Sequence, residues 1–320
     1  MKYTALIILN YNNYEDTINC IHSVEQHNTA PVKYIVVDNG STRNGVEQAL
    51  DTDFREKFAG NYNLLHENEE VPKALSRMTL LVSSTNDGYA CGNNKGLRLA
   101  YKDKDCKHVM ILNNDVLFVE DIIPRLLNTM KTLPDCAIIS PLLYKRGLKE
   151  IDYNCARKDI SIWGIIKENI FHYYYRATNK PLNANQHILR QMQLPYPDIV
   201  PIELPSGSCM LMEKEYFRQI GSFDPRTFLY YEENILFKKV QRSNRRNYLC
   251  TNIKCIHLGA QSTSKTPSLF MYRVGQKSVD YYVKNYLEYN VLTYQIYRFS
   301  AFFYKCSLYV QKKIMRKDFK

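Results

Sequence analysis

The sequence predicts an α/β fold, in which helices pack on the faces of a sheet, from two observations. In the first half of the 320-residue chain, short β-rich runs alternate with segments whose apolar residues recur at helical spacing. The composition is also globular, with 45% apolar and 23% charged residues and only 12 Gly and 12 Pro. A disordered or fibrous chain is therefore excluded.

The expected elements of the first half follow in chain order. Residues 4–9 form an apolar run that predicts a strand buried on both faces. A helix is expected over residues 14–26, where Ile18, Ile21 and Val24 share one side. Residues 88–101 are expected to be a loop that leads into a helix. The remaining expected elements are strands at 34–38, 79–83 and 107–112 and a helix at 121–131.

The second half is less regular. Residues 145–200 show little periodicity and predict a variable excursion from the fold. Regular patterns return with an apolar run at 209–212, a helix that begins at Glu213 and a helix within residues 228–242. From about residue 267 onward the pattern is helical and amphipathic. We therefore expect a main domain over residues 1–264 and a helical segment over residues 265–320.

The positive charge is concentrated in that C-terminal segment. The chain has a net charge of +11, and residues 265–320 contain eleven Lys or Arg against three Asp or Glu, interleaved with many Tyr and Phe. Such a segment can lie on an anionic membrane surface or simply pack on the core.

No signal peptide and no apolar run of 18 residues is present. The nine scattered Cys predict reduced thiols in a cytoplasmic protein.

Polar clusters follow three of the expected strands. They begin at Asn10, at Asp38 and at Asn113, and they include Tyr11, Asn39, Asn114 and Asp115. Ligands of parallel α/β sheets bind beyond the carboxyl ends of the strands, so the three clusters predict one shared site. Asn113 and Asp115 alternate along the chain and can aim at one Mg²⁺ or Mn²⁺ ion. The same residues also suit a helix cap.

Two further features suit catalysis. Glu232 and Glu233 precede a helix, where acids complement the helix dipole but can also serve as a general base. His257 ends an apolar stretch and is either a structural residue or a metal ligand.

In combination, these motifs resemble the family 2 glycosyltransferases of GT-A fold, in the bacterial rhamnosyltransferase-like branch that builds surface polysaccharides. The resemblance runs from about residue 2 to residue 262. Eight segments match in the family's order: 8–12, 37–42, 86–96, 112–116, 205–210, 221–224, 231–235 and 257–259.

The resemblance implies a role for each matching position. Asp38 contacts the nucleotide base, with Asn39 beside it, and the nucleoside pocket is lined by Asn10, Tyr11, Asn93 and Asn94. Asp115 is the last position of the D-x-D metal motif, whose first position is Asn113 here and whose middle position is Asn114. His257 completes the metal and diphosphate site. Glu233 deprotonates the acceptor, with Glu232 as the neighbouring candidate.

The activity implied is inverting, metal-assisted transfer of a hexosyl or rhamnosyl group from a UDP- or dTDP-sugar to a glycan or lipid-linked acceptor. We expect the enzyme at the inner face of the cell membrane, with the 145–200 excursion on the acceptor side. A non-catalytic subunit of an assembly complex is the main alternative. A nucleotidyltransferase would need a glycine-rich loop after the first strand, and residues 10–13 contain no Gly. No nucleic-acid-binding motif accompanies the basic segment.

Overall fold

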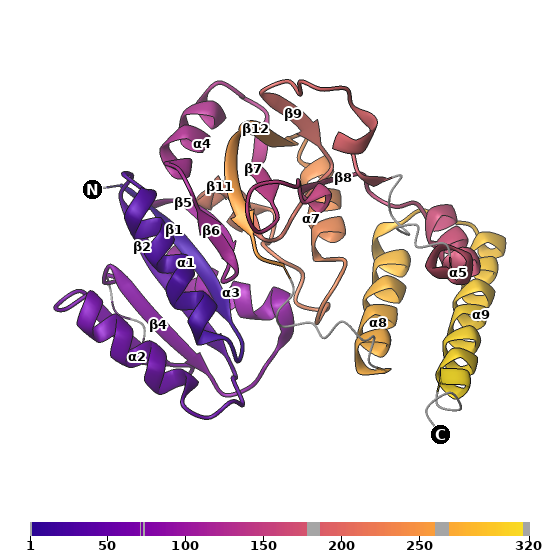
Figure 1. The fold of residues 1–320 in the computed structure, drawn as a ribbon, viewed down its shortest axis with the longest axis horizontal. Helices are drawn as coiled ribbons and strands as arrows, with labels where there is room; N and C mark the ends of the chain where they lie inside the picture. Colours follow the sequence, from indigo (N-terminus) through magenta and orange to yellow (C-terminus); the bar gives the residue numbers. More distant parts are fainter. Residues whose placement is uncertain (1, 71, 73, 178–185, 260–268, 316–320) are drawn as a thin grey trace.

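The computed structural model describes residues 2–70, 72, 74–177, 186–259 and 269–315 (Figure 1). Within this part of the chain, ten strands form one mixed sheet. Nine of them follow the order β3 (Tyr62–His66), β4 (Met78–Ser83), β2 (Val32–Asn39), β1 (Tyr3–Asn10), β5 (Cys106–Asn113), β11 (Cys209–Glu213), β7 (Cys136–Tyr144), β12 (Arg246–His257) and β6 (Val116–Phe118). The tenth, β9 (Ile199–Ile202), pairs with β12, and β8 (Ala156–Arg157) pairs separately with β10 (Leu204–Pro205).

Helices cover both faces of the sheet, as the sequence predicts. One face packs against α1 (Tyr14–His27), α2 (Val46–Lys57) and α4 (Ile122–Lys131). The other packs against α3 (Gly88–Lys102), α6 (Lys214–Gln219) and α7 (Glu232–Arg242). Successive side chains of β1 point to opposite faces of the sheet, because side chains alternate along a strand. Ile8 therefore packs in the core on the side of α1, and Ile7 packs in the core on the side of α3.

The register of the central strands brings the three polar clusters together. β2, β1 and β5 are neighbours and run parallel, with Asn10 opposite Asp38 and Leu9 opposite Asn113. The expected convergence of these strand ends is therefore confirmed. The strand β11 then enters antiparallel beside β5 and places residues 206–208 next to the same edge.

One local prediction is wrong, and one segment is more regular than its sequence pattern indicates. Residues 88–101 are not a loop that leads into a helix, because α3 begins at Gly88 itself. A Cβ at Gly88 would lie 2.1 Å from the Phe228 carbonyl oxygen, so glycine permits this close start. The 145–200 excursion also contains a 16-residue helix, α5 (Ile162–Ala177). This helix has apolar residues around most of its circumference, which hides the period expected of an amphipathic helix.

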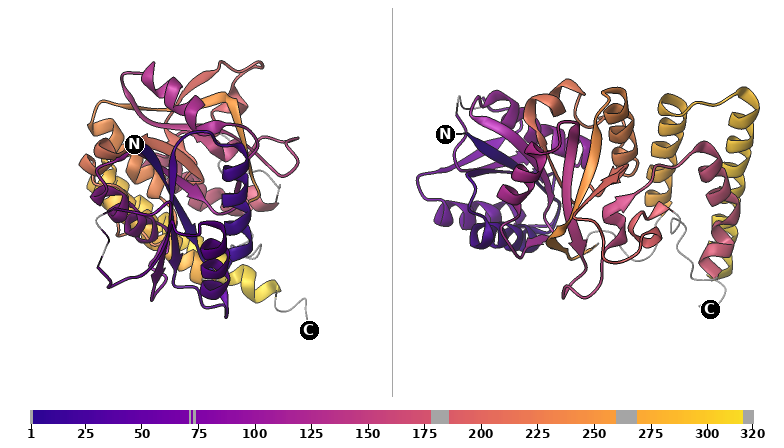
Figure 2. Two further views of the ribbon diagram at one scale, coloured as in Figure 1. Left: turned by 90° about the vertical axis from the view of Figure 1, so that its left-hand side faces the viewer. Right: turned by 90° about the horizontal axis from the view of Figure 1, so that it is seen from above.

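The C-terminal segment forms α8 (Leu269–Tyr286) and α9 (Val291–Met315). Both Figures 1 and 2 show α8 between the sheet domain and the pair formed by α5 and α9. A separate apolar cluster joins these helices to α7 through Ile165, Ile235, Tyr282 and Tyr297. Among the residues described, no helix combines the length and apolarity needed to cross a bilayer.

Candidate active site

The first part of the site is a buried polar network at the ends of β1 and β2. The Asn10 amide donates to Asp38 Oδ1 at 2.8 Å, and the Thr17 hydroxyl donates to Asn10 Oδ1 at 2.8 Å. Burial raises the pKa of Asp38, although hydrogen bonds from Ser41 and Asn10 oppose that shift. The network fixes the Asp38 carboxyl at the edge where the resemblance expects a nucleotide base.

Several predicted binding residues shape the loops around this network. The Asn39 amide donates to Asn86 Oδ1 at 3.0 Å and to the Gly88 carbonyl at 3.1 Å, which joins the end of β2 to the start of α3. The Asn114 amide donates to the Asn13 carbonyl and to Thr17 Oγ1, both at 3.1 Å. Both side chains therefore hold the rim of the predicted nucleotide pocket in place.

The two predicted asparagines of α3, Asn93 and Asn94, differ in the hydrogen bonds that their side chains form. Asn93 is buried, donates to the Tyr89 carbonyl at 2.9 Å and has an Oδ1 atom without a hydrogen-bond partner. Asn94 donates to the Phe223 carbonyl at 2.9 Å and accepts from the Phe223 N–H at 3.3 Å. Because these two bonds occupy the Asn94 amide, its structural role is to hold the 222–224 turn. The predicted contact of Asn93 with the nucleoside remains a prediction, as does that of the half-buried Tyr11.

A charged cluster lies at the end of β12. His257 Nδ1 is 2.8 Å from Asp152 Oδ2, and its Nε2 is 3.1 Å from Ser208 Oγ and 3.5 Å from Asp115 Oδ1. Burial alone would lower the pKa of His257, but the two carboxylates raise it to about 9. The structure thus brings the predicted residues Asp115 and His257 together and adds Asp152, which the sequence motifs do not include.

The donor set fits a divalent cation with incomplete protein coordination. Asp115 is buried, and its Oδ1 atom accepts no hydrogen bond at normal distance; its nearest partner is His257 Nε2 at 3.5 Å, which leaves this oxygen able to bind a cation. No group of three His, Cys, Asp or Glu side chains suited to a metal occurs among the described residues. Asp115 and the neutral form of His257 would therefore hold the cation together with substrate oxygens and water, and the cation would displace the ring proton that the two carboxylates favour.

Replacing Asp152 with asparagine should weaken metal binding while preserving the fold. The Asp152 carboxylate orients the His257 ring, and loss of such a partner typically costs about 10- to 100-fold in metal affinity. Titration of Mn²⁺ followed by electron paramagnetic resonance, with UDP present, measures this change. The control is Asn154→Ala, because Asn154 also bonds Asp152 but does not contact His257. Equal Mn²⁺ affinity in Asp152→Asn and wild type would contradict the assigned role.

The second part of the site is a pocket of about 420 Å³ at the start of α7. Glu233 Oε1 accepts the Gly207 N–H at 3.1 Å and lies 3.7 Å from the Arg157 guanidinium. Glu232 is buried, and its Oε1 atom has no hydrogen-bond partner. Burial and the adjacent Glu233 raise the pKa of Glu232 to about 8. The raised pKa favours the protonated form of Glu232, and Glu233 remains the predicted general base.

A three-residue segment connects the two parts of the site. Ser208 Oγ contacts His257, and it accepts from the Asn113 amide at 3.4 Å. The neighbouring Gly207 bonds Glu233 through its N–H and accepts from the Tyr89 hydroxyl at 2.7 Å. A Cβ at Gly207 would lie 2.7 Å from that hydroxyl oxygen, so the close approach requires glycine.

The excursion supplies pocket residues that the sequence does not reveal. Arg157, Glu168 and Gln186 line the pocket together with Glu233. Gln186 donates to Glu168 at 2.9 Å, and burial raises the pKa of Glu168 to about 7. Single polar residues in an aperiodic segment carry no positional signal, so only the fold identifies them. Asp38 and Asn10 do not line this pocket and lie at the edge formed by β1 and β2.

Comparison with known proteins agrees with this geometry. The family model described as "Glycosyl transferase family 2" matches residues 5–221, and the chain belongs to this family. A crystal structure of GalNAc-T7 with UDP, GalNAc and Mn²⁺ superposes with a TM-score of 0.61 at 12% identity, over 88% of this chain and 48% of that one. The predicted family and the GT-A fold are both confirmed.

Two curated relatives are similar over most of the chain. The low-salt glycan biosynthesis hexosyltransferase Agl10 of Haloferax volcanii is 24% identical over 254 residues, which cover 79% of this chain and 66% of the relative. The N-acetylglucosaminyl-diphospho-decaprenol L-rhamnosyltransferase of Mycobacterium tuberculosis is 24% identical over 245 residues, which cover 74% of this chain and 70% of the relative. The chain thus spans about two thirds of the length of these relatives.

Proposed function

We propose that the protein transfers a hexosyl or rhamnosyl group from a UDP- or dTDP-sugar to a glycan or lipid-linked acceptor in surface polysaccharide synthesis. The observation that carries this proposal is the 206–208 segment, which places Glu233 on one side and the Asp115–His257 cluster on the other. The two relatives support a hexose or rhamnose donor, and the second, by its name, supports a lipid diphosphate acceptor.

The chemistry is a direct displacement with inversion at the anomeric carbon. Asp38 would bind the nucleotide base, and Asp115 and His257 would hold Mg²⁺ or Mn²⁺, which when bound supplies positive charge to stabilise the leaving diphosphate. Glu233 accepts the proton of the acceptor hydroxyl as the new carbon–oxygen bond forms and the bond to phosphate breaks. Arg157 remains beside Glu233 and compensates its negative charge.

The test is a transfer assay with a defined acceptor. Purified protein is mixed with N-acetylglucosaminyl-diphospho-decaprenol, Mn²⁺ and one of four donors: dTDP-L-rhamnose, UDP-glucose, UDP-galactose or UDP-N-acetylglucosamine. Mass spectrometry of the lipid should show one added sugar with at least one donor. A lipid that stays unmodified with every donor, at protein concentrations equal to those of the acceptor, would overturn this acceptor assignment.

The outer helices offer a surface for an anionic membrane. One side of α9 exposes Leu292, Phe299, Phe302 and Phe303 to solvent by 48–71%, and α9 contains no Asp or Glu. The neighbouring α5 exposes Trp163, whose exposed fraction is 56%. Apolar residues on one side of a basic helix are typical of interfacial binding. We propose that this surface docks the enzyme on the membrane beside its lipid-linked acceptor.

Serine substitutions at Phe299, Phe302 and Phe303 should release the protein from membranes. Each buried aromatic side chain contributes about 1.5–3 kcal/mol, so the bound fraction should fall by more than about tenfold. Sedimentation with phosphatidylglycerol–phosphatidylethanolamine vesicles at low salt measures binding. The control, Leu194→Ser, removes an equally exposed apolar residue outside both helices. Wild-type protein that stays in the supernatant would contradict the proposal.

A further inference from the structure

The turn that carries the two glutamates has an unusual backbone. Tyr230 and Tyr231, which directly precede Glu232 and Glu233, have φ angles of +74° and +69°. Left-handed backbone is unfavourable for bulky residues, and two such residues in succession persist only where the surrounding structure holds them. The direction of the two glutamates therefore depends on whatever fixes this turn.

One end of the turn is held by α3. The Tyr89 N–H donates to the Phe228 carbonyl at 2.8 Å, at the close approach that Gly88 permits. The Tyr231 carbonyl accepts the Ile235 N–H at 3.0 Å, which begins the hydrogen-bonded turns of α7. Neither bond involves the Leu229 carbonyl, which lies between these two ends.

The Leu229 carbonyl is held by α8. The hydroxyl of Ser278, which is buried, donates to this carbonyl at 2.8 Å. One helical turn further along, the Tyr282 ring packs on the Tyr231 ring with 5.3 Å between centroids. Residues four apart on a helix share one side, so Ser278 and Tyr282 contact the turn together.

The Tyr282 hydroxyl bonds the buried carboxylate of Asp159, which also contacts α7. It donates to both oxygens of Asp159, at 2.8 and 2.7 Å. Asp159 in turn accepts from the Asn234 amide at 2.6 Å and pairs with Lys238 at 2.7 Å. Because Asn234 is the residue after Glu233, Asp159 connects the first turn of α7 to Tyr282 of α8.

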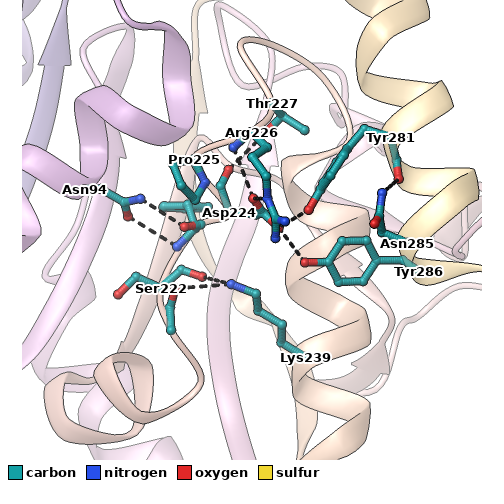
Figure 3. A network of polar contacts seen from close by, with 12 residues as sticks. Asn94, Ser222, Asp224, Pro225, Arg226, Thr227, Lys239, Tyr281, Asn285 and Tyr286 are labelled. Carbon is teal, nitrogen blue, oxygen red and sulfur yellow. Dashed lines mark hydrogen bonds and ion pairs between the residues drawn. The ribbon is translucent and has the colours of Figure 1, made fainter.

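A second carboxylate, that of Asp224, connects α8 to the core by hydrogen bonds (Figure 3). Asp224 accepts hydrogen bonds from the Tyr281 and Tyr286 hydroxyls at 2.9 and 2.5 Å, and its side chain is paired with the Arg226 guanidinium. Burial alone would raise the pKa of Asp224, but the bonds from Arg226 and Tyr286 hold it well below its usual range. Asp224 is therefore ionised at neutral pH and keeps α8 in register with the turn.

We propose that α8 is part of the catalytic machinery, with Ser278 and Tyr282 as positioning residues that hold the 229–231 turn and aim Glu233 at the acceptor. The proposal rests on the function assigned to Glu233 above. It adds that the C-terminal helices serve the transfer step itself, in addition to any contact with a membrane.

The test compares variants that each lack one buried hydroxyl group and that differ in which residue this hydroxyl bonds. Ser278→Ala and Tyr282→Phe should each lower kcat for sugar transfer by about 10- to 100-fold, because small misplacement of a catalytic group has effects of this size. Their affinities for UDP and dTDP, measured by calorimetry, should equal those of wild type. Ser278→Thr, which keeps the hydroxyl, should restore kcat.

Matched controls come from the same helical module. Ser300→Ala and Tyr297→Phe also remove buried hydroxyls. The Ser300 hydroxyl bonds the Tyr297 carbonyl and the Asn169 amide, the Tyr297 hydroxyl bonds Asp280, and in the described part of the chain neither forms a hydrogen bond with residues 229–231. Both controls should keep wild-type kcat. An equal loss of kcat in the controls, or wild-type kcat in both Ser278→Ala and Tyr282→Phe, would overturn the proposal.

Hydrogen exchange provides a readout that does not depend on turnover. In Ser278→Ala, the amide of Tyr89, which bonds the Phe228 carbonyl, should exchange faster than in wild type, while amides of β1 should not change. Unchanged exchange at Tyr89 would count against the proposal. Failure of the underlying function has a different signature: full transfer activity in Glu233→Gln would refute the role of Glu233 itself, whatever the α8 variants do.

Discussion

Replacing Asp115 with alanine is expected to lower the rate of sugar transfer by about 1,000-fold, a loss typical of removing a group that stabilises transition-state charge. Asp115 supplies the only carboxylate of the 113–115 motif. Its Oδ1 atom is buried without a hydrogen-bond donor and lies 3.5 Å from His257 Nε2. Without this carboxylate, only His257 and the predicted supporting ligand Asn113 would remain to hold the cation, and neither supplies a negative charge.

The fold should survive the Asp115 substitution. The Asp115 backbone carbonyl accepts the Leu258 N–H at 2.9 Å, and alanine keeps that bond. The measurement is the initial rate of nucleoside diphosphate release, alongside the melting temperature. Asp198→Ala, at an exposed aspartate of the excursion, serves as the control. Transfer within a few-fold of wild type in Asp115→Ala would remove Asp115 from the metal site.

Glu233→Gln is expected to lower kcat by about 100- to 10,000-fold, the range typical of losing a general base. Glutamine has the same shape, and its carbonyl oxygen can still accept the Gly207 N–H, but it cannot take a proton from an acceptor hydroxyl. Binding of UDP or dTDP should not change, because Glu233 lies on the pocket side of the 206–208 segment and not beside Asp38.

The adjacent glutamate provides the internal control for this variant. Because burial and the adjacent Glu233 raise the pKa of Glu232 and favour its protonated form, Glu232→Gln should lower kcat far less than Glu233→Gln. Single-turnover rates at pH 7 for the two variants separate the roles. The reverse order, with Glu232→Gln inactive and Glu233→Gln active, would make Glu232 the base.

The strand ends show what the sequence can predict. The apolar run of β1 ends at Asn10, and the parallel register with β2 and β5 brings Asn10, Asp38 and Asn113 to one edge. The convergence is predictable because it needs only the alternation of side chains along each strand and the general rule that ligands of parallel sheets bind at the carboxyl ends of the strands. The roles predicted for Asp115 and for the two glutamates in the first turn of α7 came from the family resemblance, since those residues alone also suit helix caps and helix dipoles.

Other parts of the site depend on contacts between distant segments. Asp152 reaches His257 from 105 residues away, and Ser278 reaches Leu229 from 49 residues away. Neither residue stands in a periodic pattern or a motif that marks its role. β12 was also missed, because its charged residues, such as Arg246 and Lys254, interrupt the apolar pattern expected of a strand in a mostly buried sheet.

Metal-dependent release of nucleoside diphosphate tests the central claim most directly. The full-length protein is assayed with each nucleotide sugar of the four-donor panel and the lipid-linked acceptor, with Mn²⁺ or Mg²⁺ and then with EDTA. We expect release with at least one donor, loss of that release in EDTA and its recovery when metal is restored. Release that EDTA leaves unchanged, or no release from any donor with either metal, would contradict a metal-assisted transfer at Asp115, His257 and Glu233.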